Sequence, residues 1–218
     1  MFMGHNVRAT LGKIARTNYQ HSYQLKREFE FFKDCTRVLD LGCGDGEFVA
    51  LSPDRIVGLD NNVETVRACV RKGLQAKHGS ATKLPYKAGS FDGVHCAHLI
   101  EHLYPEDAYL MLQEVGRVLK PGGVFVLSTP LLWAGFFEDF THVKPYYPGA
   151  IQRYLVHEPN QPTLEGMPYR FRQIELFYRY RPLWLPTRLG KVIGNWVYQY
   201  GVHSLAKDAY TLALQKLP

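Results

Sequence analysis

Hydrophobic and polar residues alternate along the middle of the chain in short blocks that predict strands and helices in turn. Apolar runs that end at glycine or at a polar residue predict buried strands over residues 37–42, 55–60, 91–98 and 124–130, with a shorter strand within 74–85. Helical spacing of the apolar residues predicts helices over residues 47–52, 62–73 and 105–120. Strands and helices that alternate at this spacing favour βαβ units, and therefore a parallel sheet with helices on both faces.

The two flanks of this alternating region have different patterns. Before it, aromatic and apolar residues recur at helical spacing over residues 19–33, which predicts a helix. After Pro130 the alternation weakens into an aromatic loop and then a helix, and the pattern predicts a late strand over 172–180 and an amphipathic helix over 187–216. The fold class that we expect is α/β: a Rossmann-like, doubly wound and mostly parallel sheet, with late strands antiparallel at one edge.

Composition places the chain among ordinary soluble globular proteins, since 46% of its 218 residues are hydrophobic and 21% are charged. It contains no apolar run long enough for a transmembrane helix, and its first twenty residues lack the apolar core of a secretory signal. The four cysteines form no C-x-x-C pair, which favours reduced thiols over a disulfide framework or a zinc site. We therefore expect a cytoplasmic protein, with peripheral contact at the inner membrane surface as a further option.

The excess positive charge is concentrated in the C-terminal third. Residues 1–150 contain 17 Lys and Arg against 16 Asp and Glu, whereas residues 151–218 contain 9 against 4. The same third is rich in aromatic residues, as in "YRFRQIELFYRYRPLWLP". This combination suits an acidic partner, such as nucleic acid, an anionic membrane surface or a phosphorylated substrate. A solvated basic face with its aromatic side chains packed inward explains it equally well.

The stretch "VLDLGCGDGEF", residues 38–48, places Gly42, Gly44 and Gly46 directly after the first predicted strand. Glycines between a strand and a helix let a ligand lie against the backbone, beside the free N–H groups of the helix start. The dinucleotide fingerprint is G-x-G-x-x-G, but here the spacing is G-x-G-x-G and Glu47 takes the place of the last glycine. An acid, Asp40, precedes the glycines, and an anionic side chain suits a cationic ligand better than a pyrophosphate.

This stretch resembles the first motif of the class I S-adenosylmethionine-dependent methyltransferases, and four further segments resemble that family in the same order. They are "VGLD", "HGSATKLPYKAGSFDGV", "AHLIEHL" and "VGRVLKPGGVFVLSTP". The resemblance covers residues 36–130 and implies a Rossmann-like fold, S-adenosylmethionine as the cofactor and S-adenosylhomocysteine as its product. It divides a single methyltransferase domain, residues 1–218, into a helical cap (1–35), a cofactor-binding core (36–130) and a substrate-side extension (131–218).

The resemblance also implies cofactor-binding residues. Asp60 follows the second strand, where the family places an acid that binds the ribose hydroxyls, and a carboxylate is suited to accept from both. Ser80 stands where many members have an acid for the adenine amino group, and Leu84 where an apolar residue packs on adenine. A turn or helix-cap role for Asp40 and Asp60, and a core role for Leu84, are the structural alternatives. The expected cofactor-binding residues are Asp40, Gly42, Cys43, Gly44, Asp60, Asn61, Ser80, Ala81, Leu84 and Cys96.

Two histidines are candidates for catalysis, and no metal is expected. His98 ends the fourth strand, where it would face the substrate or the sulfonium end of the cofactor. His142 lies in "EDFTHVKPYYPGA", which resembles a D-x-T-H-V segment of small-molecule and sugar methyltransferases; it suits a general base or, equally, a loop cap. His98, Glu101 and His102 form an H-x-x-E-H pattern that metalloproteases also use. In this family's pattern the Glu–His pair is structural.

The expected function is methyl transfer to a small-molecule, sugar or lipid-linked acceptor, with oxygen as the methylated atom. An oxygen acceptor benefits from a base, and the N-P-P-Y-type motif of many amino-group methyltransferases is absent because the corresponding stretch is "CAHL". Three alternatives remain open: an RNA methyltransferase that uses the basic C-terminal third, an enzyme acting on a membrane lipid or quinone with residues 179–200 on the surface, and a non-catalytic binding or scaffold protein. The glycine spacing disfavours a nicotinamide-dependent dehydrogenase.

Overall fold

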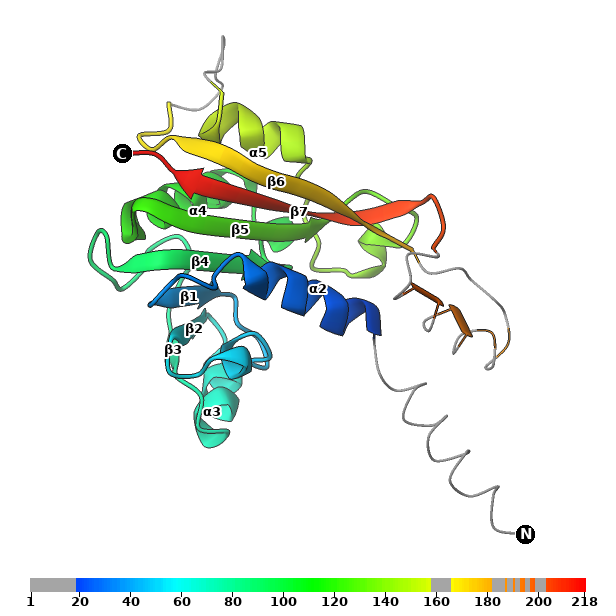
Figure 1. Ribbon diagram of the computed structural model, residues 1–218, viewed down its shortest axis with the longest axis horizontal. Coiled ribbons are helices and arrows are strands. Elements are labelled where there is room, and N and C mark those ends of the chain that lie inside the picture. Colours follow the sequence, from blue (N-terminus) through cyan, green and yellow to red (C-terminus); the bar gives the residue numbers. More distant parts are fainter. Residues whose placement is uncertain are drawn as a thin grey trace.

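The computed structural model describes residues 19–157, 166–181 and 203–218, together with 187, 190, 193–194 and 197–198. Seven strands form one sheet in the order β3-β2-β1-β4-β5-β7-β6 (Figure 1). The first five strands are mutually parallel, and β7 is antiparallel to both β5 and β6. The mostly parallel sheet and its late antiparallel edge, both expected from the sequence, are therefore confirmed. The strands are β1 Val38–Leu41, β2 Ile56–Asp60, β3 Ala76–His78, β4 Phe91–Ala97, β5 Leu119–Pro130, β6 Phe171–Tyr180 and β7 Lys207–Lys216.

The helices begin at residues whose chemistry starts a helix. The Asn62 side chain accepts hydrogen bonds from two backbone N–H groups in the first turn of α3, while Pro105 and Pro148 open α4 and α5. The helices are α2 Tyr19–Glu30, α3 Val63–Arg71, α4 Pro105–Val118 and α5 Pro148–Leu155, and the short 3-10 turns are η1 Val49–Leu51, η2 Ile100–His102 and η3 Phe136–Glu138. In Figure 1, α2 crosses the face of the sheet opposite to α4.

Two hydrophobic clusters lie on the two faces of the sheet. Leu39 and Leu41 belong to the cluster under α4 and α5, whereas Val38, the first residue of β1, packs with α2 and α3 residues in the other cluster. Successive strand residues point to opposite faces, so a buried strand needs apolar residues at nearly every position. Both faces are therefore covered, and the edge formed by the carboxyl ends of the parallel strands is left for ligands.

The C-terminal segment differs from the sequence prediction. Residues 207–216, expected to be the end of an amphipathic helix, form strand β7 between β5 and β6. Residues 209–214 are all buried, so the segment has the continuous apolar pattern of a central strand, which periodicity alone does not distinguish from a buried helix. Positions 190, 193–194 and 197–198 are helical, and the rest of the predicted helix before residue 203, except 187, lies outside the described residues, as does most of 179–200.

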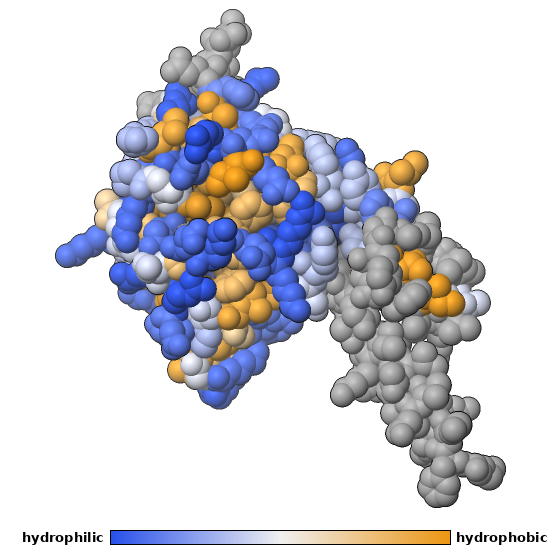
Figure 2. Space-filling model, viewed as in Figure 1, coloured by the Kyte–Doolittle hydropathy of each residue, from blue (hydrophilic) through white to orange (hydrophobic). Residues whose placement is uncertain are grey.

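Two smaller differences concern element ends. The helix predicted over 47–52 is only the 3-10 turn η1, and β5 already begins at Leu119, ahead of Gly122 and its positive φ of 79°. All four cysteines are buried and free. In the part of the chain that the structure describes, no helix has the length and apolar character to cross a bilayer. The face seen in Figure 2 is mostly hydrophilic, and its hydrophobic side chains lie in separate patches.

Candidate functional site

A cavity opens at the carboxyl ends of the first four strands. The loop after β1 contributes Gly42, and β2 and the residues after it contribute Asp60 and Asn61. Ser80 and Ala81 line the cavity from the segment after β3, and Leu99 from the turn after β4. The structure thus brings five of the sequence-predicted cofactor residues together in one cavity.

A second cavity adjoins the first at Gly42, which lines both. Asp40, Cys43 and His98 line it from the sheet side, and His21 and Leu25 of α2 line it as well. Two cavities that meet at a glycine suit an elongated ligand that bends over the backbone there.

The glycine loop is held by Asp60. One carboxylate oxygen of Asp60 accepts the backbone N–H of Gly44 at 3.1 Å, and the other accepts the N–H of Asn62 at 2.8 Å. Gly44 has a positive φ of 47° and Gly42 one of 75°, both in the left-handed region that glycine adopts without strain. Each oxygen keeps a further lone pair, so Asp60 is able to fix the loop and to accept hydroxyl groups of a ligand together.

We expect Gly46→Ala to destabilise the fold by about 2–3 kcal/mol, because it combines backbone strain with overpacking. Gly46 has a φ of 79°, and a Cβ there would lie 2.6 Å from Leu74 Cδ1 and 2.9 Å from Cys69 Sγ. Gly73→Ala is the matched control, since Gly73 has a φ of 78° and open space around it. Urea unfolding of both variants separates the two effects. Equal losses would show that packing against Leu74 and Cys69 contributes nothing.

Two of the predicted cofactor residues lie in the core. Leu84 is 4% exposed and Cys96 is fully buried, and neither lines the two cavities. Burial raises the pKa of the Cys96 thiol well above its usual value, so it stays protonated. The Ser80 hydroxyl lies at the first cavity but also accepts the backbone N–H of Thr82 at 3.2 Å.

Beneath the second cavity lies a buried charged triad, Glu28–His95–Asp40, which the sequence analysis missed. The two ring nitrogens of His95 lie 2.7 Å from an Asp40 oxygen and 3.1 Å from a Glu28 oxygen. Burial alone would lower the pKa of His95, but hydrogen bonds to Asp40 and Glu28 outweigh it and raise this pKa to about 9. His95 is therefore an imidazolium at neutral pH, shared by two carboxylates.

The surroundings of the triad fix it in place. Phe48 stacks on the His95 ring with their centroids 3.7 Å apart, and Thr211 of β7 donates to Glu28 at 2.8 Å. Burial is the largest single effect and raises the pKa of Glu28, but hydrogen bonds with His95 and Thr211 and the charge of His95 together outweigh it, so the net pKa is lowered. The only signals in the sequence were a histidine inside an apolar strand and a glutamate on the apolar face of a helix.

His98 occupies a strained position at the edge of the second cavity. Its φ of 52° makes it the only non-glycine residue with positive φ in the described part of the chain. Such conformations cost about 1–3 kcal/mol and gather at functional sites. The backbone N–H of His98 donates to the Ser128 carbonyl at 2.9 Å, which holds this conformation against β5.

The neighbours of His98 decide which ring nitrogen carries its proton. Nδ1 lies 3.2 Å from an oxygen of Glu101, which is fully buried and accepts a second hydrogen bond from Thr129 at 3.0 Å. Burial is the largest single effect and raises the pKa of Glu101, but the hydrogen bond and charge of His98 and the hydrogen bond from Thr129 together outweigh it and lower the net pKa. Glu101 is therefore a carboxylate, and Nδ1 of His98 carries a proton. Nε2 lies 3.4 Å from Nη1 of Arg179, which only donates. Nε2 therefore presents a lone pair.

His142 lies in the loop after β5 and lines neither cavity. Its Nδ1 is 2.6 Å from the Phe136 carbonyl oxygen, and its ring is 4.8 Å from that of His102. Ligand atoms of Glu101, His102 and His142 lie within 4.8 Å of one another. Hydrogen bonds within the turn and the loop already engage all three side chains, as His102 Nδ1 contacts the Thr141 hydroxyl at 2.9 Å. The absence of a metal stays a prediction.

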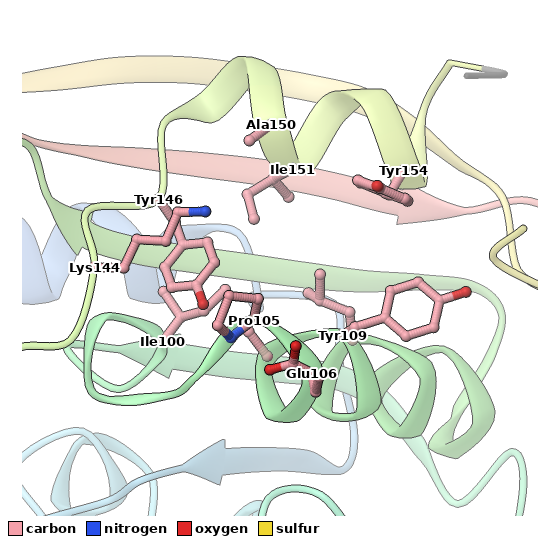
Figure 3. Close-up of a pocket in the computed structure, with 11 residues that line it drawn as sticks. Ile100, Pro105, Glu106, Tyr109, Lys144, Tyr146, Ala150, Ile151 and Tyr154 are labelled. Carbon is pink, nitrogen blue, oxygen red and sulfur yellow. The ribbon is translucent and has the colours of Figure 1, made fainter. Parts of the chain in front are cut away.

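A separate cavity of about 320 Å³ lies between α4 and α5. Figure 3 shows Tyr109, Tyr146 and Tyr154 around it, with Lys144 and Glu106 nearby. It shares no lining residue with the two cavities at Gly42. The Tyr146 hydroxyl donates to the Leu103 carbonyl at 2.9 Å, which braces the turn behind the first cavity.

Known proteins share both the sequence core and the fold. A family model described as a methyltransferase domain matches residues 39–127. An uncharacterized methyltransferase of Synechocystis is 33% identical over 155 residues, which cover 62% of this chain and 73% of that protein. The chain belongs to the class I S-adenosylmethionine-dependent methyltransferases.

The chain is also similar to a solved structure and to plant proteins. A SAM-dependent methyltransferase from Archaeoglobus fulgidus has the same fold, with a TM-score of 0.66, 22% identity and coverage of 93% of this chain and 96% of that one. The probable methyltransferase PMT5 of Arabidopsis thaliana is 45% identical over 101 residues, or 43% of this chain. This methyltransferase chain spans only 16% of the length of that plant relative.

Proposed function

We propose that the protein transfers a methyl group from S-adenosylmethionine to a hydroxyl oxygen of a small-molecule, sugar or lipid-linked acceptor. The observation that supports oxygen as the methylated atom is the Glu101–His98 pair beside the cofactor cavity. A buried carboxylate holds Nδ1–H of His98, and the Nε2 lone pair remains available. A hydroxyl acceptor needs such a base, whereas an amine with a free lone pair does not.

The residues at the two cavities fit the cofactor. Asp60 has lone pairs free for the ribose hydroxyls, Ser80 and Ala81 lie where the adenine edge would bind, and Asp40 lies at the cavity for the amino-acid end. When bound, the cofactor supplies an activated methyl group on a sulfonium. The protein then needs to align the acceptor oxygen with that methyl and to exclude water.

His98 is the candidate base in this proposal, and His142 is the alternative candidate. Nε2 of His98 would take the hydroxyl proton while the oxygen–methyl bond forms and the methyl–sulfur bond breaks, and Glu101 would stabilise the imidazolium that results. Thr129 keeps Glu101 in place from β5. His142 has its Nδ1 at a loop carbonyl and lines neither cavity, so it would act only if the acceptor reached behind the η2 turn.

Calorimetric titration with S-adenosylhomocysteine tests the cofactor assignment. We expect the wild type to bind and Asp60→Ala to bind at least about 100-fold more weakly, because each hydrogen bond to a charged group contributes about 1.5–3 kcal/mol. Asp54→Ala is the matched control, since Asp54 is exposed and lies outside both cavities. A folded wild type that fails to bind would leave a non-catalytic scaffold as the better description.

A methyl-transfer screen with labelled cofactor then tests the acceptor class. The panel contains hydroxylated sugars and aromatic acids, lipid vesicles and RNA. Methylated product from the sugars, the aromatic acids or the lipid vesicles supports the proposal. Product with RNA alone would favour the alternative that rests on the basic C-terminal third, whose nine Lys and Arg face four Asp and Glu over residues 151–218.

A further inference from the structure

Three cationic residues stand at the end of β6 and the start of β7, and one of them, Arg179, contacts His98. Arg179 pairs with Ala209 in the ladder, and Ala209 pairs with Pro130, the last residue of β5. Arg181 follows β6 directly, and its backbone N–H donates to the Ala206 carbonyl at 2.9 Å. Figure 1 shows the end of β6 and the start of β7 at the same side of the sheet as the carboxyl ends of β4 and β5. The strand register therefore places the two arginines at that edge.

Arg179 is oriented toward the candidate base. Its Nε donates to Asp208 at 3.0 Å, which fixes the guanidinium, while Nη1 lies 3.4 Å from Nε2 of His98. An acceptor hydroxyl that hydrogen-bonds to Nε2 takes the place of Nη1. The displaced N–H then needs another acceptor atom, and the nearest source is the methyl acceptor itself.

Arg181 has an unsatisfied nitrogen at the same edge. Its guanidinium carbon lies 4.0 Å from the centroid of the Trp133 ring, in the loop that follows β5. Its Nη2 is buried and has no hydrogen-bond partner among the described residues. A buried charged donor without a partner is costly, so this nitrogen favours an anionic ligand atom.

The local charge balance points the same way. Among the described residues, Asp208 is the one carboxylate that forms an ion pair with Arg179, Arg181 or Lys207, and its partner is Arg179. Within the described part of the chain, neither Arg181 nor Lys207 forms an ion pair; the Lys207 ammonium instead lies 3.8 Å over the Tyr178 ring. Glu101 is fully buried and engaged by His98 and Thr129. The edge therefore has a positive excess.

We propose that Arg179 and Arg181 form a subsite for an anionic group of the methyl acceptor, a carboxylate or a phosphate. The inference rests on the proposed function, since it takes His98 as the residue that holds the acceptor hydroxyl. A planar guanidinium places parallel N–H groups against two oxygens of one anion, which suits both groups. The subsite orients the acceptor so that its hydroxyl meets Nε2.

Binding of simple anions tests the subsite directly. Inorganic phosphate and acetate are titrated separately into protein saturated with S-adenosylhomocysteine, and NMR line widths of each anion report binding. We expect one anion to bind the wild type and to bind the Arg179→Gln/Arg181→Gln variant at least about 10-fold more weakly. Arg172→Gln, near the opposite end of β6, is the matched control. Equal affinity of double variant and wild type, or no binding to the wild type, overturns the proposal.

Turnover distinguishes the two anionic groups. Glucose, glucose 6-phosphate and glucuronate share a sugar ring and differ in one anionic group. We expect kcat/KM for one anionic sugar to exceed that for glucose at least about 10-fold. In the double variant this preference should disappear because KM for the anionic sugar rises. A preference that survives in the double variant overturns the subsite. The variants should bind S-adenosylhomocysteine like the wild type, so a variant that does not bind it is misfolded. Failure of the wild type to bind S-adenosylhomocysteine would reject the proposed function alone.

Discussion

His98→Asn should lower kcat about 1,000-fold while leaving the affinity for S-adenosylhomocysteine nearly unchanged. Removing a general base costs about 10²–10⁴ in rate. Asparagine tolerates the left-handed backbone that His98 adopts at a φ of 52°, so the loss would not come from misfolding. It cannot take a proton from a hydroxyl, although it is able to keep the hydrogen bond to Glu101.

Two further variants make this result specific. His98→Gly relieves the positive φ and leaves space where the ring stood, so added imidazole should restore part of the activity; a merely structural role would show no rescue. His157→Asn, at an exposed position after α5, is the control and should turn over at the wild-type rate. Initial rates with labelled cofactor give kcat, and calorimetry gives the affinity. A loss below about 10-fold would move the search for the base to His142.

His95→Ala should destabilise the protein by about 3–5 kcal/mol, the second large effect. The substitution leaves Asp40 and Glu28 buried without the imidazolium that both contact. Removing one partner of a buried ion pair typically costs this much, because the remaining charges stay desolvated. Urea unfolding measures the loss, and His157→Ala should fall within about 0.5 kcal/mol of the wild type. A loss under about 1 kcal/mol would show that the triad contributes little.

The same triad predicts how stability depends on pH. The pKa of His95 is about 9 in the folded protein and near 6.5 when unfolded, so its stabilisation is complete below pH 6.5 and is lost as the pH rises through 9. The pKa of Glu28 is lowered, so its stabilisation is present above its usual value of 4.5 and is lost as the pH falls below that. The wild type should lose on the order of 3 kcal/mol between pH 6.5 and 9.5 that His95→Ala does not lose. Parallel pH curves for the two proteins would contradict this assignment.

The sequence predicted the parts of the site that depend on local chemistry. Strand ends in a parallel sheet meet at one edge, so Gly42, Asp60 and Ser80 could be placed together from strand positions alone. Leu84 and Cys96 occupy the same region of the pattern but face the core. Whether an apolar residue next to a strand end packs into the core or against a ligand depends on residues far away in the sequence, so a short stretch of sequence does not predict it.

Long-range partnerships were beyond the sequence. His95 is 55 positions from Asp40 and 67 from Glu28, and no periodicity links them. The helix predicted over 187–216 was wrong for residues 207–216, because burial on both faces of a central strand erases the alternation that marks a strand. Arg179 of β6 reaches His98 only because residues 207–216 form the strand that pairs with β6. The sequence therefore shows how many basic residues the C-terminal third contains, but not where their side chains lie.

The position of β7 also determines the order in which the sheet can be completed. Lys207–Lys216 inserts between β5 and β6, and Thr211 reaches a Glu28 side chain 183 positions earlier in the chain. Strand β6 therefore has no sheet partner until the ribosome has released residues after it, and the triad stays open until then. Pairing between segments far apart in the sequence is slow, because the entropy cost of closing the loop comes before the stabilising contacts form. During synthesis β5 pairs only with β4 and has one open edge, and this is the stage at which the chain is most prone to associate with another.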